Sequence, residues 1–387
     1  MNKIISFLSS PRIFLVTIFW LMILVILGTL AQANIGLYDS QQKYFSSWIM
    51  WLWYIPVPGG RLTLLIMFIN LFTFVLKPSF WSLKKIGIIV IHCGVLLLLI
   101  GGGMTAWFSS EGMMAIDEGK KSNFIFSPYD KELVIANTSN PNYNSVIVIN
   151  DQLLEKKGII ESPELPFTIE VLDYFINCTA VLRDTDKSVD WWGYWFVEYP
   201  PNLNYKGLAQ RFLLLREDNE KERELNHTGI IFEIFSSSDE SVNGIYFLML
   251  EQPVQQSINI NDQALTLSLR RERTYLPFSL ELIDFKKEIH PGTDIAKSFS
   301  SDVSLRDRNI DRPVIIEMNV PLRHRNYTFY QSAFRENQDF DTTILSVVKN
   351  YGRLFPYIST IIMSLGLLLH MIIRLPNLFS ERKKRAK

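Results

Sequence analysis

Residues 86–104 read IGIIVIHCGVLLLLIGGGM and contain no charged side chain. An apolar run of this length provides the roughly 20 residues that an α-helix needs to cross about 30 Å of hydrocarbon. Three further stretches are similarly apolar, namely residues 13–30, 62–76 and 354–373, although the second is short. We therefore predict a membrane protein with four transmembrane α-helices, three N-terminal and one C-terminal.

The first apolar stretch allows a second interpretation, as a cleaved export signal. Lys3 and Arg12 precede it, and Ala31-Gln32-Ala33 has the small residues of a cleavage site. A retained anchor is favoured, because the run is long for a signal and further spans follow.

An aromatic cluster, Trp48, Trp51, Trp53 and Tyr54, precedes the second stretch. Such residues gather at the level of lipid headgroups. They predict a short interfacial helix or a re-entrant turn.

Positive charge predicts the orientation of the helices, because Lys and Arg accumulate in cytoplasmic loops. The basic residues that flank the spans are Lys3, Arg12, Lys77, Lys84, Lys85, Arg374, Arg382, Lys383, Lys384, Arg385 and Lys387. This pattern predicts a multi-pass membrane protein with both termini in the cytoplasm. The expected organisation is a membrane domain at 1–107, an external domain at 108–353, a returning helix at 354–374 and a basic tail at 375–387.

The external segment has the alternation of β-strands. Apolar residues recur at every second position in 265–269, 278–282 and 316–320. Polar stretches at 137–144, 216–226 and 302–312 are expected to be loops. We predict a large extracytoplasmic all-β domain of the sandwich or barrel class.

Two pairs of similar segments suggest a duplicated β unit. Ile149-Asn150-Asp151-Gln152 recurs at 260–263, and Leu165-Pro166-Phe167 recurs at 276–278, both with an offset of 111. Chance similarity between amphipathic strands is the alternative. The duplication predicts two β modules, with Asn-Asp as the turn and Leu-Pro-Phe opening the next strand.

The composition excludes several classes of function. Lys+Arg and Asp+Glu both number 39, so no basic field predicts nucleic-acid binding. The two cysteines, Cys93 and Cys178, are too few for a disulfide framework or a cysteine-ligated cluster. No phosphate loop, zinc-protease motif or serine-hydrolase motif is present, so the residues indicate no catalysis by this chain alone.

His92 is the main candidate for a binding residue, because it is an ionisable group inside a predicted span. Burying an imidazole in hydrocarbon is unfavourable unless it binds a metal, another helix or water. It lies about 10 Å from Lys85 at ~1.5 Å per residue. Neutral imidazole ligates haem iron well. A hydrogen bond to a neighbouring helix is the structural alternative.

His370, four residues before Arg374, is a second intramembrane histidine on the same side. It could pair with His92, although a packing or interfacial role is favoured. Outside the membrane, the aromatic run Trp191 to Phe196 indicates a strand core, a membrane-skimming loop or a platform for a flat ligand. The external histidines His227, His290 and His324 fit a solvated surface.

Several motifs resemble the ResB (CcsB) family of cytochrome c biogenesis proteins, which act in System II. Ser9-Ser10-Pro11-Arg12 and Leu27-Gly28-Thr29 match its first helix, and residues 91–102 match its third. Later matches are Leu276-Pro277-Phe278, Asp284-Phe285, Pro291-Gly292-Thr293, residues 299–302, Asn319-Val320-Pro321-Leu322 and Phe329-Tyr330-Gln331-Ser332. His290 and Asn350-Tyr351-Gly352 depart from the family pattern, which weakens the subfamily assignment.

This resemblance implies a cytochrome c biogenesis factor that carries haem across the membrane and supports its attachment to apocytochrome c. It implies haem b as the transported cofactor, His92 as an axial ligand and, as partner, a haem-handling CcsA (ResC) protein in a separate chain. The chain would then be a non-catalytic or accessory subunit of a cytochrome c synthase (haem lyase) complex in the bacterial plasma (inner) membrane.

Two alternatives remain at the level of sequence. The first is a membrane-tethered scaffold or sensor whose β domain binds a ligand or an envelope protein, with structural histidines. The second is a haem b electron-transfer subunit that uses His92 and His370 as paired ligands within one chain.

Overall fold

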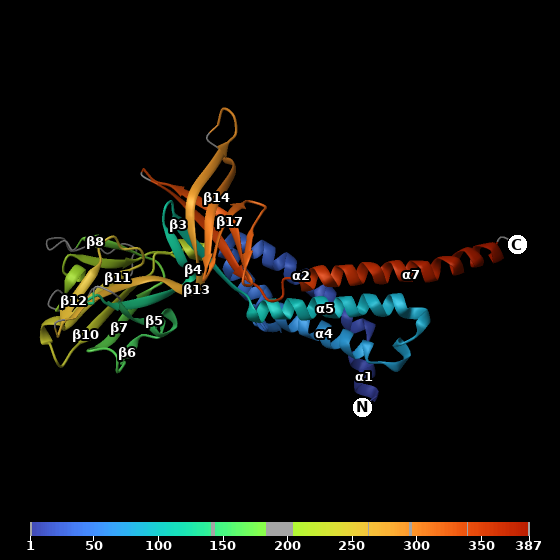
Figure 1. Cartoon of the computed structure of the whole chain (residues 1–387). Helices are drawn as coiled ribbons and strands as arrows, with labels where there is room; N and C mark the ends of the chain where they lie inside the picture. The colour runs from blue at the N-terminus through green and yellow to red at the C-terminus, as the bar shows by residue number, and fades with distance from the viewer. Residues whose placement is uncertain are drawn as a thin grey trace. The chain divides into compact units, whose positions relative to one another are not determined.

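A computed structural model describes residues 2–140, 144–182, 204–261, 263–293, 296–338 and 340–385 (Figure 1). The chain forms two compact units. The first comprises Met1–Glu111, Pro321–Phe329 and Val347–Lys387, and the second comprises Gly112–Val320 and Tyr330–Ser346. The domain boundaries expected from the sequence stay predictions.

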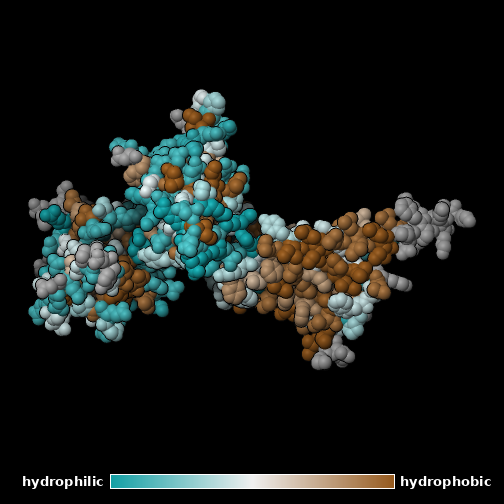
Figure 2. Space-filling view, viewed as in Figure 1, coloured by the Kyte–Doolittle hydropathy of each residue, from teal (hydrophilic) through white to brown (hydrophobic). Residues whose placement is uncertain are grey.

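The first unit contains the apolar helices, and apolar side chains cover them on the face shown in Figure 2. Its long helices are α2 (Pro11–Ile35), α4 (Gly60–Val75), α5 (Ile86–Phe108) and α7 (Phe355–Arg385). Among the described residues, three segments are long and apolar enough to cross a membrane: Pro11–Phe45, Ile86–Phe108 and Phe355–Leu375. The predicted second span is the shorter apolar helix Gly60–Val75. The predicted set of three N-terminal apolar helices and one C-terminal span is confirmed.

Helix α2 begins and ends at defined caps. The side chain of Ser10 accepts a hydrogen bond from the backbone N–H of Arg12, and Pro11 occupies the first turn, where a missing N–H is tolerated. The helix ends before Gly36, whose φ of 77° favours glycine. After this turn the chain folds back through α3 (Leu37–Ser40) and η1 (Gln41–Phe45). The Phe45 ring then lies so close to Gly28 that an added Cβ there would be 2.7 Å from it.

The aromatic cluster lies in a β-hairpin, so the predicted interfacial helix is wrong, whereas the chain does turn back here and the re-entrant location of that turn stays a prediction. Strands β1 (Ile49–Leu52) and β2 (Ile55–Pro58) pair in antiparallel register, with Leu52 opposite Ile55. Pro56 and Pro58 lack the backbone N–H that a helix requires, which disfavours the helical alternative.

Helix α4 is tied to the junction between α1 (Asn2–Leu8) and α2. The side-chain amide of Asn70 donates to the backbone oxygens of Leu8, at 2.5 Å, and Ser10, at 3.0 Å. At the other end of α4, the indole N–H of Trp20 donates to the oxygen of Pro58 at 2.8 Å. These contacts make α4 run antiparallel to α2, and they satisfy the one polar amide that interrupts its apolar sequence.

Helices α5 and α7 pack through glycines spaced by seven residues. A Cβ at Gly87 would lie 2.6 Å from the Cα of His370, and one at Gly94 would lie 2.6 Å from the Cγ of Met363. Gly101 faces Phe355 in the same way. Small residues at one face let two helix backbones approach closely. Of the three consecutive glycines 101–103, Gly101 lies in this contact, whereas a Cβ at Gly102 would meet nothing within 4 Å.

The second unit is all-β, as predicted, with antiparallel pairing. Its smaller sheet has the order β11-β10-β7-β6, and its larger sheet runs β15-β14-β13-β4-β3-β18-β17, with β5 on β4 and β12 on β13. The strand bounds are β3 Ser110–Asp117, β4 Lys121–Asn137, β5 Ser145–Asn150, β6 Gly158–Ile160, β7 Thr168–Phe175, β8 Cys178–Leu182, β9 Phe212–Arg216, β10 Gly229–Phe235, β11 Gly244–Met249, β12 Gln256–Ile260, β13 Gln263–Ile289, β14 Ala296–Asp307, β15 Ile310–Glu317, β17 Tyr327–Glu336 and β18 Asp341–Lys349. Strand β16 (Leu322–His324) belongs to the first unit.

Alternating apolar residues from both sheets build one core. Leu265, Leu267 and Leu269 of β13 are almost fully buried and pack with Ile169 of β7 and Phe232 of β10. This layering is that of a β-sandwich, in which the inner faces of two sheets supply the core.

The apparent duplication does not correspond to repeated structure. Asn150 is followed by the helix α6 (Asp151–Glu155), whereas Ile260 and Gln263 face each other across a tight β12–β13 hairpin. Leu-Pro-Phe precedes β7 in the first copy but lies inside the long strand β13 in the second. The similarity therefore reflects shared amphipathic patterning rather than two equivalent modules.

Residues 302–312, predicted to be a loop, mostly lie in the β14–β15 hairpin. Val303 and Leu305 are buried, as is Asp307 two residues further along β14, whereas Arg306 between them is exposed. In the same region Met318 and Val320, predicted to lie in a strand, are exposed and follow the end of β15. The loop prediction was wrong because it rested on polar composition alone, and an exposed strand face tolerates many charges.

Candidate functional site

His92 lies on α5, and its ring is held by a hydrogen bond within the helix. Its Nδ1 is 2.8 Å from the backbone oxygen of Ile88. A carbonyl oxygen only accepts, so Nδ1 carries the proton and donates. In this neutral tautomer the lone pair resides on Nε2. The arrangement is the one in which a second hydrogen bond fixes the ring of a metal-ligating histidine.

Two phenylalanine rings lie against the imidazole. The ring of Phe74, near the end of α4, stacks on His92 with a centroid distance of 5.5 Å. The ring of Phe80 meets it edge-on at 5.4 Å. Phe80 is only 4% exposed and packs in a small apolar cluster with Val75 and Ile89. His92 therefore lies in an apolar, aromatic environment and retains partial exposure.

The link between α4 and α5 brings Phe80 to this position. It contains the short helix η2 (Pro78–Phe80), and the Trp81 indole N–H donates to the backbone oxygen of Val75 at 2.9 Å. The Lys77 ammonium lies 5.9 Å from the centre of the Phe74 ring. A cation therefore flanks the aromatic wall of the site.

His92 does not lie on the face of α5 that contacts His370 of α7. The backbone of His370 packs against Gly87, on the face of α5 that meets α7. At ~100° per residue, His92 is about 140° around the helix from Gly87 and about 160° from Gly94. The structure thus brings His92 to Phe74 and Phe80, and it gives no geometric support to paired ligation by His92 and His370. Ligation by His370 stays a prediction.

The remaining candidate residues form no centre with His92. Cys178 is buried in the second unit, where its thiol donates to the oxygen of His227 at 3.3 Å, and burial raises its pKa to about 12. His227 and His290 are exposed. Within the described ranges, no group of three or more His, Cys, Asp or Glu side chains could hold a metal ion. The aromatic run 191–196 lies outside the described residues.

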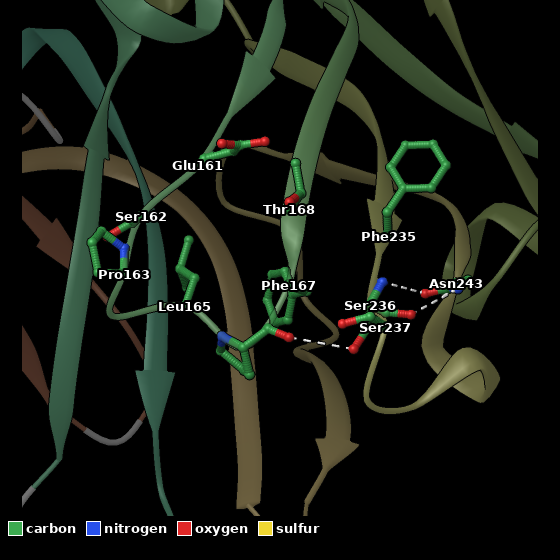
Figure 3. A pocket seen from close by; sticks show the side chains of 11 residues that line it. Glu161, Ser162, Pro163, Leu165, Phe167, Thr168, Phe235, Ser236, Ser237 and Asn243 are labelled. Carbon is green, nitrogen blue, oxygen red and sulfur yellow. Dashed lines mark hydrogen bonds between the residues drawn. The ribbon is translucent and has the colours of Figure 1, made fainter.

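The second unit has an open depression between the end of β6, the start of β7 and the end of β10 (Figure 3). The backbone N–H of Ser236 donates to the side-chain oxygen of Asn243 at 2.6 Å, and the Ser236 hydroxyl donates to the oxygen of Pro166 at 3.3 Å. Glu161 is the one ionisable residue in its lining. These polar groups already bond to one another, so the depression has no arrangement that indicates catalysis.

Sequence reasoning identified His92 but missed the two rings that enclose it. Phe80 belongs to a short polar and aromatic link, where no periodic pattern indicates burial. The contact face of α5 had a detectable signal, because Gly87, Gly94 and Gly101 recur every seven residues along one face of a helix.

Together, the apolar helices, the β-sandwich unit and a single enclosed histidine define a membrane protein with a large all-β domain. Residues 246–350, from β11 to just beyond β18, match the model of the ResB-like family. Protein NrfI of Wolinella succinogenes is 21% identical over 325 residues, covering 83% of this chain and 30% of that protein. The chain thus spans less than a third of the length of this relative. These matches confirm the resemblance to the ResB family.

Proposed function

We propose that this chain is a cytochrome c biogenesis factor that holds haem in the membrane through His92. The resemblance to the ResB family and to Protein NrfI supports the biogenesis role. The CcsA-type partner, the transported haem b and the apocytochrome c acceptor are parts of this proposal. The chain itself would act as a non-catalytic subunit of the complex that attaches haem.

The observation that carries the proposal is the contact of 2.8 Å between Nδ1 of His92 and the backbone oxygen of Ile88. The bond from Nδ1 to the oxygen of Ile88 leaves the Nε2 lone pair as the ligating group. A histidine fixed in this way keeps its second nitrogen available, as a haem-ligating imidazole requires. The apolar rings of Phe74 and Phe80 suit a flat, membrane-soluble macrocycle.

The proposed orientation follows from the register of α5 and α7. Gly87 lies against His370, so Lys85 and Arg374 are near the same end of the helix pair. Basic residues at one end favour the cytoplasmic side. With this orientation His92 is close to the cytoplasmic face, and both termini are cytoplasmic.

The residues of this chain would act by binding and orientation. Ile88 would fix the plane of the His92 ring, Nε2 would hold the iron, and Phe74 and Phe80 would exclude water from one side of the ring. Imidazole ligation would hold and orient the haem for thioether attachment. The β unit would brace the partner or receive the apocytochrome, and attachment itself would take place in the partner.

Complementation tests the biogenesis role. A strain that lacks this gene would be supplied with the native chain, with His92→Ala or with His370→Ala, and covalent haem in its c-type cytochromes would be measured by haem staining. We expect restoration by the native chain and by His370→Ala, and a loss of most staining with His92→Ala. Full c-type cytochrome content in the deletion strain itself would overturn the proposal and favour the scaffold alternative.

A further inference from the structure

The β1–β2 hairpin connects η1 to α4, and hydrogen bonds join its two ends at the base. The backbone N–H of Gly59 donates to the oxygen of Trp48 at 3.0 Å, and that of Arg61 donates to the oxygen of Ser47 at 3.3 Å. The backbone of Phe45 lies so close to Gly60 that a Cβ there would be 2.8 Å from its Cα. The base is therefore fixed to the helices, while the tip, at Trp53 and Tyr54, extends away.

The tip is almost entirely exposed, although it is aromatic. Trp53 is 90% exposed and Tyr54 is 92% exposed, and Trp51 and Ile55 are also exposed. Residues 46–59 contain no charged side chain. Leaving apolar surface in water is unfavourable by about 25 cal/mol per Å². Trp and Tyr, with an apolar ring and one polar group, are the residues best suited to a boundary between hydrocarbon and water.

The hairpin lies beyond one end of an apolar helix. It lies next to Gly60, at the opposite end of α4 from Lys77, and Trp20 of α2 bonds to Pro58 at its base. The 16 residues of α4 extend about 24 Å at ~1.5 Å each, close to the ~30 Å of a hydrocarbon core. The apolar surface of the spans therefore continues directly into the hairpin.

Two cations flank the base of the hairpin. Lys43 lies on η1, 5.5 Å from the ring of Tyr44, and Arg61 begins the first turn of α4. In the part of the chain that the structure describes, no ion pair to a carboxylate joins either residue. A cation next to an uncharged aromatic segment is complementary to a lipid phosphate.

We infer that the β1–β2 hairpin is an interfacial anchor that inserts Trp51, Trp53 and Tyr54 among the phospholipid headgroups, with Lys43 and Arg61 binding lipid phosphates. It fixes the depth of α2 and α4 in the bilayer at the end remote from Lys77. This inference depends on the membrane location alone, so it can fail or hold independently of haem binding.

Spin-label accessibility tests the anchor in the full chain, reconstituted in nanodiscs of phosphatidylcholine and phosphatidylglycerol. In a Cys93→Ser, Cys178→Ala background, a nitroxide would be attached at Ile55→Cys and, as the aqueous control, at Ser237→Cys in the second unit. We expect the ratio of collisions with oxygen to collisions with a water-soluble nickel chelate to be several-fold higher at position 55 than at 237. Equal ratios would overturn the inference. A label at 55 that is immobilised and shielded from both reagents would show protein contact instead, and would also overturn it.

The phosphate contact has a separate measurement. With Lys43→Gln and Arg61→Gln, the collision ratio at position 55 should fall in discs that contain phosphatidylglycerol, and it should no longer differ from the ratio in pure phosphatidylcholine. A ratio that responds to phosphatidylglycerol equally with and without the two cations would remove Lys43 and Arg61 from the proposal.

Discussion

The Nδ1 of His92 donates to the backbone oxygen of Ile88, one turn earlier on α5, at 2.8 Å. This bond selects the tautomer and directs the lone pair of Nε2 away from its own helix backbone. A single intrahelical contact thus fixes the ring of this histidine and leaves Nε2 as the nitrogen that our proposal assigns to the iron.

The Phe80 ring should contribute to retention of the bound group, because it meets the His92 ring at 5.4 Å. An aromatic pair contributes about 0.5–1.5 kcal/mol, which corresponds to a two- to twelve-fold change in binding at about 1.4 kcal/mol per tenfold. We expect Phe80→Leu to reduce haem per purified complex by that factor. Phe72→Leu, a matched change at an exposed α4 position that stacks on Phe68, should leave it unchanged. Equal losses in the two variants would contradict the contact.

The packing of α5 on α7 predicts a strong difference between two glycines of the same helix. A Cβ at Gly87 would meet the backbone of His370, whereas one at Gly102 would meet nothing within 4 Å. Because a backbone cannot move aside easily, Gly87→Ala should lower stability by about 1–3 kcal/mol. Gly102→Ala should be neutral or stabilising by up to about 1 kcal/mol. Thermal unfolding in detergent measures both, and similar melting temperatures would contradict this register.

Lys131 of β4 should make the free energy of unfolding of the second unit depend on pH. Its side chain is almost fully buried, and burial, followed by repulsion from Arg223, lowers its pKa, although Asp151 opposes the shift. A lysine with a lowered folded pKa binds protons more weakly when folded. Stability is therefore reduced below the folded pKa and rises as the pH increases toward the unfolded value of about 10.4.

We accordingly expect Lys131→Met to raise the melting temperature at pH 7 and to flatten its rise at alkaline pH. Lys121→Met, at an exposed position of the same strand, is the matched control and should change neither. A lower melting temperature for Lys131→Met at pH 7 would show that the charged form stabilises the unit through Asp151.

The features that followed from sequence are those with a strong periodic or compositional signal. Residues 86–104 predicted α5, and alternation in 265–269 predicted the inner face of β13, because hydrocarbon and the sandwich core each select one pattern. The position of Phe80 against His92 was beyond this reasoning, since it depends on how an irregular link folds. The hairpin at Trp53 was also missed, because aromatic composition indicates an interface without specifying the backbone conformation there.

The most direct test of the central claim is a reduced-minus-oxidised absorption spectrum of the complex purified with its CcsA-type partner. It would be recorded for the native chain, for His92→Ala and for His370→Ala. The account predicts a haem b band in the native and His370→Ala samples, its loss in His92→Ala, and its recovery when imidazole is added. An unchanged band in His92→Ala, or no haem in an intact native complex, would contradict the assignment of His92 as the ligand.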